Sequence, residues 1–295
     1  MMKWLCLSLS YLIMLSSESW LGLWMGLELN SLSFVPILIN LSKETSLKYF
    51  LVQSFGSVLF LMGVFNLNFS VFSYMGLLLK AGVAPLHFWV LSVTKNMSWS
   101  ILMLLLTVQK LGPLLGLALS EFSSALVIIL SALLGSFGGF IQSNLRLILS
   151  FSSIAHLSWL LINLNSMMLF FSYYLIYSFI SILLGISFNK SKIFSISQMN
   201  FPQSLLSKLS MSMSLLSLGG LPPLLGFFIK WMTIEMNFLP VSICVGLVLS
   251  TCISLFFYLK IVMVPLLSPF NYLLKWDWVI LLSFSINCLL PLLII

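Results

Sequence analysis

The stretch that decides the fold runs from residue 204 to 238 and reads SLLSKLSMSMSLLSLGGLPPLLGFFIKWMTIEMNF. As one helix rising 1.5 Å per residue it would reach about 52 Å, far more than the roughly 30 Å hydrocarbon core of a bilayer. Near its centre, Gly219-Gly220 precedes Pro222-Pro223; the glycines relax the backbone and the prolines remove backbone donors. We therefore predict two half-helices that meet at residues 219–223, with Lys230 in the second.

The rest of the chain also has the composition of a membrane protein. Of its 295 residues, 61% are apolar and 6% are charged, whereas a soluble domain has about 25% charged residues. Only helices and closed barrels satisfy every backbone polar group inside hydrocarbon. The apolar runs are about twenty residues long and do not alternate with a period of two, which favours helices over a barrel. The predicted fold class is all-α, a polytopic helix bundle forming one membrane-embedded domain over residues 1–295, without a soluble domain.

The apolar runs predict about eleven spans. The fourth contains Ala81-Gly82-Val83-Ala84-Pro85, which predicts a discontinuity at residues 81–85, and the fifth carries a further break at Gly112-Pro113. The first run resembles a signal peptide, but so many spans follow it that we expect a retained helix and no presequence. The expected spans are 3–17, 21–40, 46–66, 69–93, 98–118, 122–141, 145–163, 167–187, 204–238, 240–264 and 274–295.

Basic residues outside the centres of these spans all fall on one side of the membrane when the sides alternate from span to span. The opposite side holds only the acids Glu18 and Glu121, and Lys260 near the end of its span can extend to the basic side. The positive-inside rule places the basic side in the compartment from which insertion occurs. The other residues of the basic side are Lys3, Lys43, Lys48, Lys95, Arg146, Lys190, Lys192, Lys208 and Lys275.

Three lysines remain, Lys80, Lys110 and Lys230, and each lies near the middle of a span. A lysine there costs at least about 2.5–3.5 kcal/mol and usually marks an ion path, a proton relay or a buried pair. Burial disfavours the charged amine, so a buried lysine can release and regain a proton, whereas arginine stays charged. A carboxylate such as Glu28, in the second span, restores the charge. Static ion pairs are the alternative, but one deep acid cannot neutralise three lysines.

Two histidines and one further acid are the remaining candidates for proton transfer. His156 lies in mid-span, where it either relays protons near neutral pH or is held by a neighbouring hydroxyl. His87 follows the break in the fourth span and could serve an entry path. A haem held by both histidines would need them to face each other and is disfavoured. Glu235, beyond Lys230, is either an exit group or a surface acid.

Cofactor motifs are absent from the sequence. It contains no CxxC, no P-loop and no GxGxxG after a strand. We expect no nucleotide, flavin, iron–sulfur cluster or metal on this chain, so any redox energy must come from partners. The cysteines are expected to be small buried apolar residues; they are Cys6, Cys244, Cys252 and Cys288. The pairs Gly22/Gly26 and Gly112/Gly116 are interpreted as sites of close helix packing.

The run from Leu79 to Val90, LKAGVAPLHFWV, closely resembles the lysine-bearing broken helix of the NADH dehydrogenase subunit 2 family, the antiporter-like subunits of mitochondrial complex I. Further stretches are similar to the same family in the same order, so the resemblance covers nearly the whole chain. They are WMGLE at 24–28, KYFL at 48–51, QKLGP at 109–113, SSIAH at 152–156, SLGGLPPLLGF at 217–227 and KW at 230–231.

The resemblance implies a proton-translocating membrane-arm subunit of NADH:ubiquinone oxidoreductase in the mitochondrial inner membrane, with its basic loops facing the matrix. It also implies that Glu28 pairs with Lys80, that Lys110 is the central carrier and that Lys230 lies on the outlet half. Flavin, iron–sulfur clusters and quinone would belong to partner subunits. The implied partners are other membrane-arm subunits, including sister antiporter-like subunits, and the lipid bilayer, with no nucleic acid.

We therefore expect protons to enter through water reached by the broken fourth and fifth spans, and to leave on the acidic side. Between these points they would pass among Glu28, Lys80, Lys110, His156 and Lys230, with quinone reduction elsewhere supplying the energy. Two alternatives stay open. A standalone cation/proton antiporter of related fold would favour additional buried carboxylates, and a structural spacer in the membrane arm would keep the lysines in dry surroundings.

Overall fold

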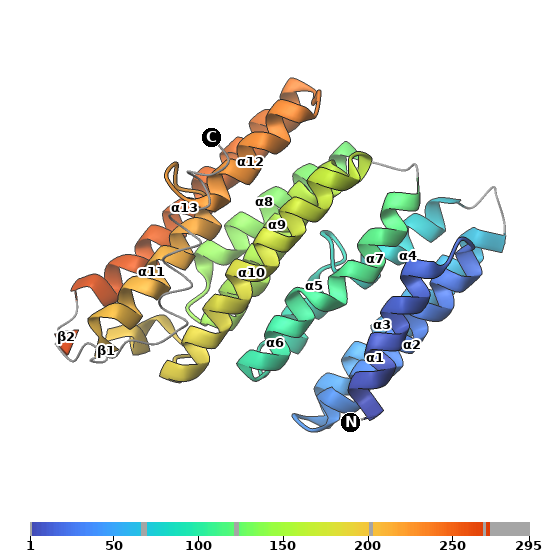
Figure 1. The fold of residues 1–295 in the computed structure, drawn as a ribbon, viewed down its shortest axis with the longest axis horizontal. Helices are drawn as coiled ribbons and strands as arrows, with labels where there is room; N and C mark the ends of the chain where they lie inside the picture. Colours follow the sequence, from blue (N-terminus) through green and yellow to red (C-terminus); the bar gives the residue numbers. More distant parts are fainter. Residues whose placement is uncertain (1, 66–69, 121–123, 201–202, 268–269, 272–295) are drawn as a thin grey trace. The chain divides into compact units, whose positions relative to one another are not determined.

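Helices make up almost all of the described part of the chain (Figure 1). The computed structural model describes residues 2–65, 70–120, 124–200, 203–267 and 270–271. They form two compact units, unit 1 of residues 1–127 and unit 2 of residues 128–295, and the boundary falls within helix α8. The predicted all-α class is confirmed. That the whole chain acts as one domain stays a prediction.

Unit 1 is built from seven helices and the start of an eighth. Helices α1 to α4 pack on one another in sequence order, and α7 packs against α2 and α4. The helices are α1 (Met2–Ser16), α2 (Trp20–Ile39), α3 (Lys43–Phe65), α4 (Ser70–Ala81), α5 (Phe88–Thr94), α6 (Trp99–Leu106) and α7 (Val108–Leu119).

Unit 2 is built around α9, whose residues are buried almost throughout. A two-residue parallel pair, β1 (Gln203–Ser204) with β2 (Phe270–Asn271), joins the start of α11 to the end of α13. This pair was not predicted. The other elements are α8 (Ala125–Ile141), α9 (Leu145–Ile162), η2 (Asn163–Asn165), α10 (Met167–Ser191), η3 (Ile196–Asn200), α11 (Leu205–Gly219), α12 (Leu225–Met236) and α13 (Val241–Leu267).

Two of the three predicted breaks are present, at residues 81–85 and at 219–223. The fourth span ends as α4 at Ala81 and resumes as α5 at Phe88. Gly82 has φ +72°, and the bonds from Gly82 N to Leu79 O and from Val83 N to Leu78 O form the Schellman closure of a helix end.

The ninth span divides in a similar way into α11 and α12. Gly220 has φ +91°, and the amide of Leu221 reaches the carbonyl of Leu216. Glycine is required at both helix ends because a side chain at such positive φ is strained.

The expected break at Gly112-Pro113 is wrong. Helix α7 continues through Pro113, and the interruption lies earlier, at Thr107, where φ is −111° and ψ is −85°. The Thr107 hydroxyl donates to Met103 O at 2.7 Å, the carbonyl that also receives the Thr107 amide. Such back-bonding by threonine bends helices. Lys110 therefore lies in the first turn after a break, three residues beyond it, rather than just before one.

The two GxxxG pairs mark close packing, as interpreted. The side chain of Met14 in α1 lies against both Gly26 of α2 and Gly112 of α7, where any Cβ would overlap it. A Cβ at Gly116 would lie 3.0 Å from Leu77 in α4. These glycines let α1, α2, α4 and α7 approach closely enough to enclose the polar residues of unit 1.

Helices long and apolar enough to cross a membrane account for most of the expected spans. The expected span at 274–295 lies outside the described residues, so the total of eleven stays a prediction. Shorter apolar helices occur at Lys3–Ser16, Ser70–Ala81 and Ala125–Ile141. The longer candidates are Trp20–Ile39, Lys43–Phe65, Trp99–Leu119, Leu145–Asn165, Met167–Ser191 and Val241–Leu267.

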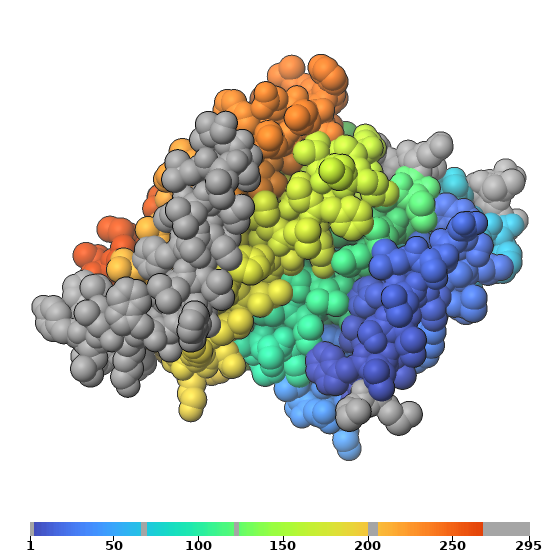
Figure 2. Space-filling model, viewed as in Figure 1, coloured from blue at the N-terminus to red at the C-terminus, as the bar shows by residue number. Residues whose placement is uncertain are grey.

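Burial of the cysteines was predicted wrongly. Cys6 and Cys252 are exposed and Cys244 is half-buried, while Cys288 lies outside the described residues. Helix α1 is dark blue in Figure 2. It exposes Cys6 together with the apolar side chains Trp4, Leu5, Leu9 and Leu12. A small apolar side chain on a membrane-facing surface is covered by lipid or a neighbouring subunit, so it need not be buried within its own chain.

Candidate functional site

Unit 1 brings Glu28 and Lys80 into an ion pair. Glu28 Oε1 lies 3.0 Å from Lys80 Nζ, and the side chains are 22% and 1% exposed. Lys80 is in the last turn of α4, where the helix dipole favours a cation. Gly56 of α3 makes room for the lysine stem, because a Cβ there would lie 2.9 Å from Lys80 Cγ. The pairing implied by the resemblance is therefore present in the structure.

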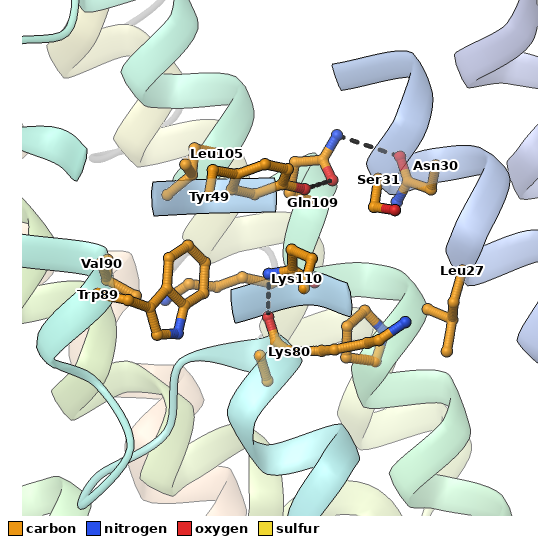
Figure 3. Close-up of a pocket in the computed structure, with 13 residues that line it drawn as sticks. Leu27, Asn30, Ser31, Tyr49, Lys80, Trp89, Val90, Leu105, Gln109 and Lys110 are labelled. Atoms are coloured by element: carbon orange, nitrogen blue, oxygen red, sulfur yellow. Dashed lines mark hydrogen bonds between the residues drawn. The ribbon is translucent and has the colours of Figure 1, made fainter. Parts of the chain in front are cut away.

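Lys80 and Lys110 line the same small cavity (Figure 3). Lys80 comes from the end of α4 and Lys110 from the start of α7, so each faces the cavity from beside a helix interruption. The cavity offers about 10 Å³ to water, which is close to the space of one water molecule.

A chain of hydrogen bonds forms one wall of this cavity (Figure 3). Tyr49 Oη donates to Gln109 Oε1 at 3.2 Å, and Gln109 Nε2 donates to Asn30 Oδ1 at 3.1 Å. Asn30 Nδ2 donates to Tyr11 Oη at 3.0 Å, and Tyr11 Oη donates to Val108 O at 2.7 Å. The chain fixes the residue preceding Lys110 and the backbone at the start of α7.

Two carbonyls at the end of α4 accept hydrogen bonds from side chains. Trp89 Nε1 donates to Leu79 O at 3.0 Å, and Gln53 Nε2 donates to Lys80 O at 3.4 Å. Irregular backbone at membrane depth requires such partners. The side chains of Trp89 and Gln53 thus stabilise the helix interruption beside Lys80.

Unit 2 positions Lys230 by backbone oxygens. Lys230 Nζ, in α12, donates to Leu218 O at 3.2 Å and to Gly219 O at 2.9 Å, the last carbonyls of α11. A helix C-terminus carries partial negative charge and favours a cation. A Cβ on Gly220 would lie 3.1 Å from this amine, so the glycine that ends α11 also leaves space for Lys230.

His156 lies near Lys230 on the wall of a second cavity, which also offers about 10 Å³ to water. Its Nδ1 is 2.8 Å from Tyr173 Oη, and its ring centre is 4.8 Å from that of Tyr177. The interpretation of His156 as a hydroxyl-bonded histidine is confirmed, and the shared cavity with Lys230 leaves a relay role open to it.

Comparison with known proteins places these features in a family. The family model described as NADH:quinone oxidoreductase/Mrp antiporter, transmembrane, matches residues 65–257. NADH-ubiquinone oxidoreductase chain 2 of Artemia franciscana is 51% identical over 293 residues, which cover 99% of each chain. The chain belongs to the NADH-ubiquinone oxidoreductase chain 2 family. Chain 2 of Anopheles gambiae is 41% identical over 85% of this chain and 81% of its own length.

A solved structure from the same enzyme class has the same fold. A chain of respiratory complex I from Thermus thermophilus, determined with bound aureothin, superposes with a TM-score of 0.82 at 21% identity. The match covers 95% of this chain and 74% of that one. The antiporter-like membrane fold expected from the resemblance is therefore confirmed.

Within the chain 2 fold, the predicted relay residues divide between the units. Glu28, Lys80 and Lys110 gather in unit 1, and His156 and Lys230 gather in unit 2. Their role in proton transfer stays a prediction.

The other candidates lie apart from the two cavities. His87 is buried at the start of α5 and stacks on Phe88 with ring centres 4.5 Å apart. Glu235 is exposed and accepts a hydrogen bond from Trp231 Nε1 at 3.0 Å. Lys208, assigned above to the basic side, is buried in α11.

Sequence reasoning missed the polar wall of the first cavity and Tyr258 in the second. Asn30, Gln53 and Gln109 were visible as amides in the middle of apolar spans, and that placement is a usable signal because buried amides need partners. Among the described residues, no three His, Cys, Asp or Glu side chains are grouped to hold a metal ion. The absence of a cofactor on this chain stays a prediction.

Proposed function

We propose that this chain moves protons across the membrane through two buried stations, Glu28/Lys80/Lys110 in unit 1 and His156/Lys230 in unit 2. As a member of the chain 2 family it is a membrane subunit of NADH:ubiquinone oxidoreductase involved in proton translocation. We further propose the mitochondrial inner membrane as its location, with the basic loops on the matrix side. The flavin, iron–sulfur clusters and quinone would lie on partner subunits.

The observation that carries the relay is the Glu28–Lys80 pair at the edge of a cavity that Lys110 also lines. A carboxylate 3.0 Å away favours the charged form of the Lys80 amine. If the pair opens, the buried ammonium loses its partner and gives its proton to the cavity. Moving one charge through 100 mV takes about 2.3 kcal/mol, and breaking a buried pair involves about 3–5 kcal/mol. Opening and closing the pair is therefore a large enough change to drive the transfer.

The second station works by a different interaction. Among the described residues, Lys230 forms no ion pair with a carboxylate and is held instead by the carbonyl oxygens of Leu218 and Gly219. Dipoles stabilise an ammonium less than a full charge does, so Lys230 is suited to hold a proton briefly and release it. His156, on the same cavity wall, is the nearest candidate for exchange with it.

Replacing Glu28 with glutamine tests the first station. The amide keeps the shape but not the charge, so Lys80 should lose its proton and proton translocation should fall by about tenfold or more. The measurement is the rate of proton uptake by vesicles containing the reconstituted complex. Glu44→Gln is the matched control, because Glu44 pairs with Lys48 on the exposed start of α3 and surface pairs contribute little. Equal translocation in both variants would remove the first station from the mechanism.

A further inference from the structure

One buried hydroxyl on the wall of the second cavity forms no hydrogen bond of normal geometry among the described residues. It belongs to Tyr258 of α13, which is 1% exposed, and the Ser152 side chain on the same wall interacts with it. Leaving a buried polar group unpaired costs about 1–3 kcal/mol, and such groups in native structures usually face a bound water or have a functional role. The cavity that Tyr258 lines also contains Lys230 and His156 on its wall.

The serine hydroxyls on the same wall already donate hydrogen bonds. Each donates its proton to a carbonyl of its own helix, so it presents only acceptor lone pairs to the cavity. None of them can pass a proton on without giving up that bond. The bonds run from Ser152 to Leu149 O at 2.8 Å, from Ser250 to Leu247 O at 2.7 Å and from Ser254 to Thr251 O at 2.9 Å.

A water in this cavity would find a complete set of partners. Lys230 directs two of its three N–H bonds to Leu218 and Gly219, which leaves a third. Tyr258 offers an O–H, and the serine oxygens offer acceptors. The cavity provides about 10 Å³ to water, and a buried water needs about that space and two to four polar partners.

We infer that Tyr258 is a proton-transfer residue that works with Lys230 through a water bound in this cavity. The inference rests on the proposed relay role of Lys230 and His156. A proton leaving the His156 imidazolium binds the Tyr258 oxygen while the phenol's own proton passes to the water. A proton of that water then binds the neutral amine of Lys230. Three bonds to hydrogen form, three break, and one positive charge moves from the ring to the amine.

Tyr258 suits this step because its hydroxyl can both accept a proton on one side and donate one on the other. A phenol both donates and accepts, and its O–H is free to rotate when no partner fixes it. After each transfer, rotation of the O–H restores the starting arrangement. The serines of the same wall lack this freedom because their protons are held by carbonyls.

Tyr258→Phe in the assembled complex tests the inference. Removing the one oxygen should slow NADH oxidation coupled to proton translocation by at least about tenfold, and should raise the ratio of the rates in H₂O and D₂O because proton transfer becomes limiting. The matched control is Tyr174→Phe, a buried tyrosine of unit 2 that stacks on Phe170 and does not line the cavity. The control should keep the wild-type rate and isotope ratio. A wild-type rate and ratio in Tyr258→Phe would overturn the inference.

Two further measurements cover the other outcomes. If Tyr258→Phe does not assemble, a density map of the wild-type complex that resolves water decides the matter. Water within hydrogen-bond distance of both Tyr258 Oη and Lys230 Nζ is expected, and a dry cavity contradicts the role. Lys230→Met separates this inference from the relay itself. If Lys230→Met stops translocation while Tyr258→Phe does not, only the role of Tyr258 fails; if Lys230→Met has no effect, the second station fails.

Discussion

Replacing Lys110 with methionine should lower the rate of proton translocation by about a hundredfold or more. Lys110 lies just after the helix break at Thr107 and shares its cavity with Lys80, so it is the acceptor nearest to the Glu28–Lys80 pair in the proposed path. Methionine fills similar volume but cannot hold a proton. Methionine removes the cost of burying an amine in an apolar environment, so the complex should still assemble. The measurement is the rate of vesicle acidification during NADH oxidation by the purified, reconstituted complex.

Lys43→Met is the matched control, because Lys43 is a lysine of the same unit that is exposed at the start of α3. It should translocate protons at the wild-type rate. Normal acidification by Lys110→Met would count against the relay and favour the structural-spacer alternative, in which the lysines only hold helices together.

Replacing Gly226 with alanine should prevent stable assembly. Gly226 is in the first turn of α12, and a Cβ there would overlap the carbonyl oxygen of Ser217 near the end of α11. Backbone cannot move aside as a side chain can, so the two half-helices must separate, at a cost of about 3 kcal/mol or more. The separation would also withdraw Lys230 from the carbonyls that hold it. The measurements are the amount of assembled complex and its temperature of thermal inactivation.

Gly246→Ala provides the comparison for this second variant. Gly246 lies inside α13, and its added Cβ would meet Ile129 at 3.6 Å, an ordinary contact. Alanine is about 1 kcal/mol better than glycine within a helix, so this variant should assemble normally and inactivate at the same or a higher temperature. If both variants behave alike, the close approach of α11 and α12 at Gly226 is not needed for the fold.

The helix breaks show what the sequence could and could not predict. Gly82 and Gly220 were predictable because positive φ at a helix end has a residue signature. Thr107 was not, because a threonine within an apolar run is common and only its bond to Met103 O shows that it interrupts the helix. Gly112-Pro113 looked like a break, yet Pro113 is accommodated in α7.

The charged residues of the candidate site were predictable, because a charge inside the membrane is costly. The contacts between neutral polar residues were not. Lys80, Lys110 and Lys230 could be identified because an amine within hydrocarbon is energetically costly and usually has a function. The pairing of Glu28 with Lys80 came from family resemblance rather than from spacing. Which neutral groups meet depends on how helices rotate about their axes, and the sequence of one span does not set this. The bond between Gln109 and Asn30 and the orientation of Tyr258 therefore appeared only in the structure.

The attachment of Lys230 to the carbonyls of Leu218 and Gly219 has a consequence for genetics. The same amine binds the end of a neighbouring half-helix and is the proposed proton carrier, so we expect any substitution at this position to alter structure and proton transfer together. Hydrogen bonds to a charged donor contribute about 1.5–3 kcal/mol each, enough for a respiratory defect to arise from misfolding alone. The effect of a mutation at position 230 can therefore be interpreted only when the amount of assembled subunit is measured together with the rate of proton translocation.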